Sequence, residues 1–545
     1  MNNTEHYNIF QCGLLSAHFD HINKFKQTVV DYGINGTPFK TAKYLPFRKI
    51  ICLILFIFCF ISISFPQVYT PADPYYLLEL DRALFDSDTH AQTTIIRPFY
   101  IDNGQQWSIW FRSEYYLNDN APNQENMDVR YFGKGVGMFN SLHMSFYNDF
   151  IAFSFEPYML QGENKAVKIY DRPGSFAVLN DTPKNLNTKF SKGGLRDAQV
   201  YLHFKGFGIG ISNAGMWWGP GIQGTLSMTN NTIGFPHYML GTIRELRWRN
   251  IGFMGRYTFA EIARKPYVDP TYFTSLTGII SFYVNPIISI GFSRNYLSGG
   301  VDVGTPWTAE RAALIVFESF LIENNYINDY TIAGHDPFDQ TLSGYFSMWY
   351  PDSKLKLYLE IGFNDNRQNF WDFVVQPDHA MATIIGFQHY KFLGNKNLLF
   401  GFEYANLING RMQVFRVTPP WYNRSHYDHF SYEGRRWGAH SGSDSDDLLI
   451  FFGWMGDKWT IIPMWNYERH GVTTYRPNEI KSEIRLDTRY QLTSDMQLGV
   501  YYEWQYEAHL GFPKDHYFIN EITGERRTHT LILRFEYTIK NYMKN

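Results

Sequence analysis

Aromatic, amide and glycine–proline residues are concentrated in one long predicted loop, which lies between alternating segments at 208–212 and 242–248. The loop begins with Met216-Trp217-Trp218-Gly219-Pro220-Gly221 and later contains Asn230-Asn231. Adjacent side chains of a strand point to opposite faces, so Trp217 and Trp218 cannot both face one core from a strand. Gly-Pro-Gly fixes a turn that another backbone or a ligand can approach closely. Indole faces and side-chain amides suit sugar binding; the alternative is a loop that packs on itself inside a larger fold.

A second stretch, Gly434–Asp447, combines guanidinium, indole and carboxylate groups. Arg435 and Arg436 suit the carboxylates of an acidic sugar, and Trp437 suits stacking on a sugar face. The alternative is that the two arginines pair with the aspartates that follow. Residues 441–447 offer carboxylates of the kind that Ca²⁺ prefers, but they lack the spacing of an EF-hand loop. We therefore predict a solvated loop here, with no metal ion and no cofactor.

These two stretches resemble the signatures of a known family. The run WWGPGIQGTLSMTNNTIGFPH, residues 217–237, resembles the signature loop of the capsule assembly protein Wzi family, and residues 434–447 resemble its later signature in a Bacteroidetes-like branch. The resemblance implies a β-barrel in the outer membrane of a Gram-negative bacterium that binds capsular or exopolysaccharide and helps to hold the capsule on the cell. On this interpretation the candidate ligand-binding residues are Trp217, Trp218, Asn230, Asn231, Arg435, Arg436 and Trp437.

Catalytic motifs do not stand out elsewhere. His426 and His429 lie in an aromatic-rich segment without further metal ligands at suitable spacing, which is typical of surface-loop histidines. The sequence has no G-x-S-x-G, no P-loop and no dinucleotide fingerprint at a strand-to-helix junction. We therefore predict a protein that is not an enzyme. A polysaccharide hydrolase remains an alternative, because the separation of paired carboxylates is spatial and cannot be recognised in a sequence.

The elements that position these loops are strands. From about Trp107 to the end of the chain, apolar residues alternate with polar ones, as in 151–156, 355–361 and 480–489. Tight turns are predicted at 148–149, 206, 250, 285–286, 351–353, 394–396, 456–458 and 493–495. Between them lie long connections at roughly 116–138, 159–196, 213–241, 261–277, 296–339, 363–380, 407–447, 468–479 and 507–527. Strict alternation of short and long connections is typical of membrane barrels.

This count predicts an all-β fold, a transmembrane antiparallel barrel of about 18 strands over residues 105–545, with long extracellular loops. Such a barrel leaves a polar lumen unless loops fill it, and Lys481 and Arg489 would face that lumen. An open lumen would make the protein a porin or a transporter, which is the other alternative. The best helix within this region is Thr308–Leu321, with Leu314, Phe317 and Leu321 on one face. It lies either across the barrel mouth or against other outer loops.

The N-terminal part carries a different pattern. Arg48-Lys49 precedes an apolar run at 50–61, too short to span a bilayer, and Ser62-x-Ser64 then fits a secretory signal cleaved after Ser64. Residues 1–64 are therefore predicted to be an extension plus signal peptide. The three cysteines, at 12, 52 and 59, all lie within it, which argues against disulfides, zinc–cysteine sites and thiol catalysis in the mature chain. Residues 65–104 are predicted to be a periplasmic segment with a short helix over Asp73–Phe85, in which Leu77, Leu80 and Leu84 share one face.

Composition agrees with this interpretation. Among 545 residues, Lys+Arg number 49 and Asp+Glu 52, so the net charge of −3 gives no indication of nucleic-acid binding. Phe, Tyr and Trp make up 18% of the chain. Aromatic enrichment is typical of barrels with aromatic girdles at the two membrane interfaces, where outer-membrane lipid would contact the wall. It is equally suited to a carbohydrate-binding β protein.

Overall fold

The structure is a computed structural model that describes residues 67–70, 72, 76–86, 93–102, 107–179, 182, 187–263, 270–300, 307–319, 321, 338–365, 367, 369–412, 414, 417–422, 430–513 and 524–539. The chain divides into two compact units, Met1–Ser62 and Ile63–Asn545, and every described residue belongs to the second. The predicted signal segment and the histidines at 426 and 429 lie outside the described residues. The domain limits of 1–64, 65–104 and 105–545 therefore stay predictions.

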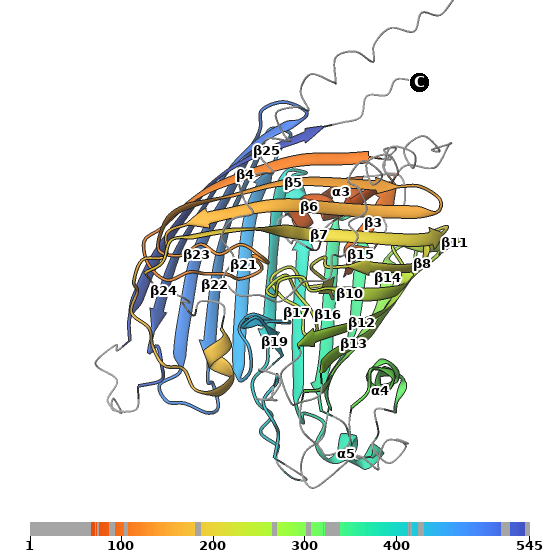
Figure 1. Cartoon of the computed structure of the whole chain (residues 1–545), viewed down its shortest axis with the longest axis vertical. Coiled ribbons are helices and arrows are strands. Elements are labelled where there is room, and N and C mark those ends of the chain that lie inside the picture. The colour runs from red at the N-terminus through yellow and green to blue at the C-terminus, as the bar shows by residue number, and fades with distance from the viewer. Residues whose placement is uncertain are drawn as a thin grey trace, which may run out of the picture. The chain divides into compact units, whose positions relative to one another are not determined.

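A closed antiparallel barrel forms the body of the second unit (Figure 1). It has 18 strand positions, as predicted. Strands β10 and β11 share one position, since both pair with β12, and the ring closes where β25 pairs with β4. The barrel strands are β4 (Trp107–Asn118), β5 (Gly135–Tyr147), β6 (Ile151–Gly162), β7 (Phe190–Phe204), β8 (Phe207–Ser212), β10 (His237–Thr242), β11 (Leu246–Trp248), β12 (Ile251–Ala263), β13 (Thr271–Phe282), β14 (Ile287–Gly299), β15 (Phe338–Tyr350), β16 (Leu355–Asn364), β17 (Met381–His389), β18 (Leu398–Asn406), β21 (Ser445–Met455), β22 (Trp459–His470), β23 (Glu479–Gln491), β24 (Met496–Ala508) and β25 (Arg526–Ile539).

Each predicted tight turn joins two neighbouring strands, and each predicted long connection leaves the other end of the barrel. The turn between β5 and β6 shows why these sequences reverse the chain: the Asn148 side chain accepts hydrogen bonds from Phe150 N and Ile151 N, at 2.8 and 2.7 Å. At the turn between β7 and β8, Lys205 and Gly206 both have positive φ, the conformation that matches the twist of a two-residue hairpin.

The two faces of the wall differ as the alternation predicted. In β23, Ile484 and Leu486 are exposed on the outside, whereas Lys481, Glu483 and Arg489 are buried on the lumen side. An apolar outer face and internally paired backbone groups are what a lipid environment requires. Among the described residues, no helix is both long enough and apolar enough to cross a membrane.

The segment before the barrel lies in its lumen, at the end with the short turns. It comprises β1 (Gln67–Thr70), α3 (Leu77–Asp86), β2 (Ile96–Arg97) and β3 (Phe99–Asp102). Leu77 and Leu84 of α3 are buried, as predicted, while residues 73–75 lie outside the described residues. The helix is attached to the wall by an ion pair between Asp81 and Lys356 of β16, at 2.7 Å. Its assignment to the periplasmic side stays a prediction.

The helix predicted at 308–321 is observed as α4 (Ala309–Leu314) followed by η3 (Ile315–Phe317), and Leu321 beyond them forms a β-bridge with Arg367 of another outer loop. The helix packs on the outside of the wall, where Thr274 Oγ1 donates to Ala312 O at 2.6 Å. Leu314 and Phe317 are both exposed, at 57% and 64%, and the residues that pack on the wall are Ala312, Ile315 and Val316. The chain changes from α- to 3₁₀-helix after Leu314.

Candidate functional site: the plug that joins two distant loops

The tandem tryptophans lie inside the lumen. They form β9 (Trp217–Trp218), which pairs with β2, and Gly219 N donates to Ile95 O at 3.0 Å. Both side chains are 0% exposed. Trp217 lies under the guanidinium of Arg97, at 4.7 Å, and Trp218 stacks on Phe273 of β13, with centroids 6.2 Å apart. The two rings do point to opposite faces, but protein covers both faces because the strand is enclosed by the barrel.

The turn that follows the tryptophans is attached to the wall by one carboxylate. Glu403 of β18 accepts hydrogen bonds from three successive backbone amides, Ile222 N at 2.6 Å, Gln223 N at 3.1 Å and Gly224 N at 2.9 Å. Tyr358 OH donates to the same carboxylate at 2.7 Å. Glycines at 219, 221 and 224 let the backbone of this turn approach the wall closely, so that three N–H groups reach one acceptor. Glu403 therefore fixes the first signature loop, residues 217–237, to the wall.

Glu403 and its neighbour on the wall were missed by the sequence interpretation. Glu360 of β16 accepts from Leu226 N at 3.2 Å, on the same loop. The alternation along 355–361 does place Glu360 on the lumen side, so that part of the signal was present in the sequence. Its partner lies 134 residues away, and no local pattern identifies such a partner.

The two signature loops bind each other. Thr229 N donates to Trp437 O at 2.5 Å, and Thr229 Oγ1 donates to Gly438 O at 2.8 Å. Asn231 Nδ2 also donates to Gly438 O, at 2.8 Å, while its Oδ1 accepts from Asn126 N at 2.7 Å. The predicted amide donors are therefore used within the protein, between segments more than 200 residues apart. Asn230 Nδ2 similarly donates to the backbone, at Asn126 O.

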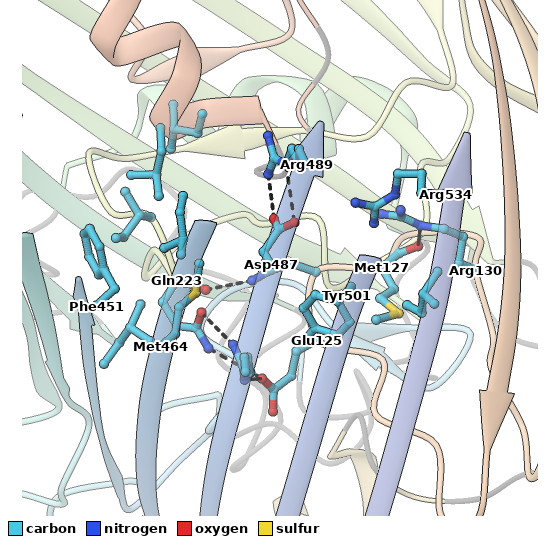
Figure 2. A pocket seen from close by; sticks show the side chains of 18 of the residues that line it. Glu125, Met127, Arg130, Gln223, Phe451, Met464, Asp487, Arg489, Tyr501 and Arg534 are labelled. Carbon is cyan, nitrogen blue, oxygen red and sulfur yellow. Dashed lines mark hydrogen bonds and ion pairs between the residues drawn. The ribbon is translucent and has the colours of Figure 1, made fainter. Parts of the chain in front are cut away.

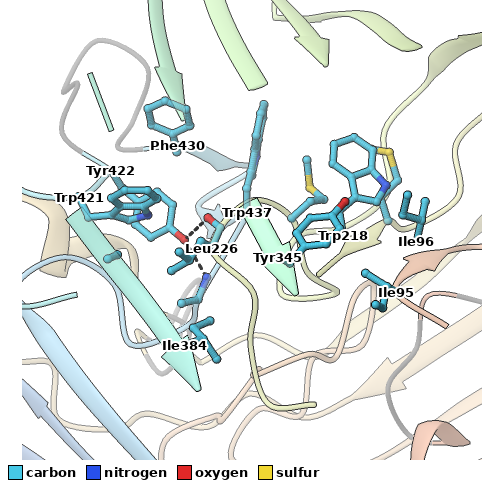
Figure 3. Close-up of a cluster of buried hydrophobic side chains, with 14 of the residues drawn as sticks. Ile95, Ile96, Trp218, Leu226, Tyr345, Ile384, Trp421, Tyr422, Phe430 and Trp437 are labelled. Carbon is cyan, nitrogen blue, oxygen red and sulfur yellow. Dashed lines mark hydrogen bonds between the residues drawn. The ribbon is translucent and has the colours of Figure 1, made fainter. Parts of the chain in front are cut away.

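An aromatic cluster fills the space where these loops meet (Figure 3). Trp437 packs edge-on to Phe273, with centroids 4.8 Å apart, and stacks near Phe235 at 5.6 Å. Tyr422 OH donates to Leu226 O at 2.8 Å, which links this cluster to the turn held by the wall. Burial raises the pKa of Tyr422 well above its ordinary range, so its hydroxyl stays a donor.

The two arginines bind backbone carbonyls of other loops. Arg435 donates to Asp128 O, to Gln124 Oε1 and, at 2.5 Å, to Arg130 O. Arg436 donates to Ser175 O at 2.6 Å and lies 5.0 Å above the Tyr422 ring. Burial lowers the pKa of Arg435 to about 10, because charge is costly away from water. The arginines thus tie the second signature loop, residues 434–447, to the loops at 119–134 and 163–189.

The serine- and aspartate-rich end of this loop is buried, so the prediction of a solvated loop was wrong. Asp444 accepts hydrogen bonds from Thr473 N and Thr474 N, each at 3.0 Å, and from both threonine hydroxyl groups. Its carboxylate therefore stabilises the turn after β22. Asp446 is paired with Arg469.

A charged cluster surrounds His440. Its Nε2 lies 3.1 Å from carboxylate oxygens of both Asp447 and Glu468, which raises the pKa of His440 to about 10 despite its burial. Glu125, His440 and Glu468 have the geometry of a possible metal site. However, Lys481 Nζ contacts both Glu125 and Glu468, so the protein already supplies cations at this position. We assign no metal ion to the cluster.

One cavity lies within the lumen, between α3, the first signature loop and strands β21 to β25 (Figure 2). Its volume is about 160 Å³, below the roughly 300–1,000 Å³ of ordinary ligand pockets. Charged groups line it in pairs: Asp487 binds Arg489 at 2.6 Å, and Glu125 binds Arg485 at 2.6 Å. Among the described residues, α3 and the first signature loop therefore occupy the lumen around this cavity.

Comparison with known proteins agrees with this architecture. Residues 118–509 match the family described as capsule assembly protein Wzi. The barrel is similar to that of the Escherichia coli protein Wzi, described as an outer-membrane protein involved in group 1 capsule assembly and a carbohydrate-binding β-barrel. That match has 11% identity, a TM-score of 0.54, and coverage of 86% of this chain and 99% of that one. Pseudomonas aeruginosa OprD is less similar, with 8% identity, a TM-score of 0.38, and coverage of 80% and 94%. No curated protein sequence matches the chain.

Proposed function

Because the chain belongs to the capsule assembly protein Wzi family, we propose that it binds capsular or exopolysaccharide without cleaving it and supports capsule assembly or attachment at the cell surface. The protein is a β-barrel of the outer membrane of a Gram-negative bacterium. The observation that carries the proposal is the plug itself. Two signature loops are fixed to each other and to the wall, so the barrel acts as a support for its outer loops.

The seven predicted binding residues support this function mainly by position. All are buried in the described conformation, and side-chain donors of Asn230, Asn231, Arg435 and Arg436 bind protein groups. Direct contact of these seven residues with sugar stays a prediction. We propose that they hold the outer loops in place, and that exposed residues of those loops make the first contact with the polymer.

The loop at 163–189, between β6 and β7, is the best candidate for that contact. Arg436 binds its Ser175 O, so the loop rests on the second signature loop. Lys168 and Lys189 are exposed on it, and Lys168 Nζ lies 4.6 Å above the ring of Tyr170. Cations beside an aromatic face suit an acidic sugar, which offers carboxylates and an apolar ring face.

The test compares binding of the cell's own purified capsule to three forms of the protein in detergent. Lys168→Glu together with Lys189→Glu should weaken binding at least about tenfold, since each reversal replaces attraction by repulsion. Lys396→Glu, an exposed lysine in the short turn between β17 and β18, is the matched control and should bind as the wild type does. Equal binding by all three forms would contradict the proposed contact surface.

Two other functions are tested in the same preparation. A porin would show steady large conductance in planar bilayers, whereas the plugged lumen should conduct little. A hydrolase would shorten the capsule chains during incubation. The buried carboxylates Glu360 and Glu403 bind backbone amides of the plug, which favours a structural role for them.

A further inference from the structure

Two loop segments pack on the outward face of the wall, and their helices α4 and α5 are labelled in the lower part of Figure 1. The first is α4 with η3. In β14, exposed Ile290 and Phe292 mark the outward face, and Arg294 and Tyr296 continue that face towards the long-loop end. Tyr296 belongs to the same packed cluster as Ile315 of η3. The segment therefore covers the outside of the barrel.

This cover satisfies polar groups that would otherwise face lipid. Arg294 Nη1 donates to Val316 O at 3.2 Å and also to Glu318 O. Its Nε donates to the side chain of Gln340 on β15, at 3.1 Å. A guanidinium on the outer wall is costly in lipid unless backbone carbonyls accept its donors. The segment is thus anchored to the wall by specific bonds.

The second segment is α5 (Phe370–Val375), which packs on the outward face of β16. Phe373 meets Phe363 edge-on, with centroids 5.7 Å apart, and Phe363 shares its face with exposed Leu357 and Ile361. The guanidinium of Arg367 lies over both phenylalanine rings, at 4.7 and 5.2 Å. An isolated β-bridge between Leu321 and Arg367 joins the two segments.

The combined surface, Ala309–Phe317 with Phe370–Val375, is called the outer collar here. Its far side exposes Leu314, Phe317, Phe370, Trp371 and Val374, and Trp371 is 69% exposed. These side chains are continuous with the apolar outer wall, which lipid contacts in an outer-membrane barrel. We propose that the outer collar inserts into the outer leaflet at the boundary between headgroups and acyl chains.

Three features favour lipid as the occupant. Apart from Glu310 at the start of α4, the exposed side chains of the collar are aliphatic or aromatic, and Trp and Phe are preferred at membrane interfaces. The collar faces sideways, from the outward side of β12 to β16, whereas a capsule would approach the loop tips. The charges beneath it are already bound, since Arg367 pairs with Asp372 at 3.4 Å.

The test places a fluorophore on the collar. Single cysteines replace Leu314 or Trp371 in the full chain, with Cys12, Cys52 and Cys59 changed to alanine, and each is labelled with a polarity-sensitive dye. Lys165→Cys, on another outer loop and 61% exposed, is the matched control. The proteins are reconstituted in phosphatidylcholine vesicles whose acyl chains are brominated either near the carbonyl group or near the methyl end.

Both collar positions should show blue-shifted emission and stronger quenching by bromine near the carbonyl group, because an interfacial element lies only about 5–10 Å deep. The control should not be quenched. As a second measurement, brominated lipid should quench more tryptophan emission in the wild type than in Trp371→Phe, which needs no label. Quenching of the collar no greater than that of the control would overturn the proposal. So would disulfide-linked dimers through either collar cysteine without lipid quenching, which would identify a second copy as the occupant.

Discussion

Replacing Glu403 by alanine should release the first signature loop from the barrel wall. The carboxylate accepts three backbone N–H groups, from Ile222, Gln223 and Gly224. Each buried donor left without an acceptor costs about 1–3 kcal/mol, which gives roughly 3–9 kcal/mol for three. The adjoining cavity is lined by Ile222 and Gln223, so water can reach these amides. We therefore expect the lower half of that range, about 3–6 kcal/mol.

Glu403→Gln tests whether the loop is held by the acceptor atoms of the side chain or by its negative charge. Oε1 accepts from Gln223 N and Gly224 N, whereas Oε2 accepts from Ile222 N and from Tyr358 OH. A glutamine with its carbonyl at the first position keeps two acceptor contacts, and its NH₂ then opposes the amide of Ile222. The stability of Glu403→Gln should therefore lie between that of the wild type and that of Glu403→Ala.

The assay combines single-channel conductance with limited proteolysis of folded protein in detergent. Glu403→Ala should show intermittent openings and new cleavage within residues 221–236. Glu507→Ala is the matched control, since Glu507 is a buried lumen carboxylate that binds Arg526 of the wall at 2.6 Å, away from the first signature loop. It should lose stability while staying closed. The reasoning is refuted if Glu403→Ala stays closed and protease-resistant, with a wild-type unfolding midpoint.

Three further predictions concern other attachments of the plug. His440 has its pKa raised from 6.5 to about 10, so the stability it contributes is complete below pH 6.5 and is lost as the pH rises through about 10; His440→Gln should flatten this decline in thermal melts. Lys356→Met should cost about 3–5 kcal/mol by leaving Asp81 buried without its cation, and adding Asp81→Asn should recover most of that loss in denaturant titrations. Gly438→Ala should lower the unfolding midpoint by an amount equivalent to about 1–3 kcal/mol, because its Cβ would overlap a tyrosine hydroxyl group, whereas Gly224→Ala meets nothing closer than 3.7 Å and should be nearly neutral.

The barrel could be predicted from sequence because its two environments impose simple rules. Lipid outside and polar groups inside enforce period two, so β23 and its partners were recognisable without any contact information. The turn at Asn250 was correctly placed by the same rule, between β11 and β12. Where the rule does not apply, prediction was weaker. The helix at 309–317 was recognised from its periodicity, but its position on the outside of the wall was not.

The candidate site was harder to interpret for a physical reason. A lumen lined by charges requires loops that carry complementary groups, because an unpaired buried charge is costly. Glycine-rich turns, amides and guanidinium groups meet that requirement, as Gly224, Asn231 and Arg435 show. The same groups suit sugar binding. Residue type therefore could not separate a ligand contact from a plug contact, and contact of the seven residues with sugar stays a prediction.

This distinction gives the proposed function a sharper form. If the plug supports the outer loops, then loss of a plug attachment should affect barrel closure as well as capsule binding. Loss of a surface charge on an outer loop should affect capsule binding alone. Reversal of Lys168 and Lys189 should weaken capsule binding while the barrel stays closed and fully stable. Glu403→Ala should open the barrel and also weaken binding, because Arg436 and Ser175 connect the plug to the loop that carries those lysines. Binding that survives an opened plug would show that the outer loops hold their shape without it.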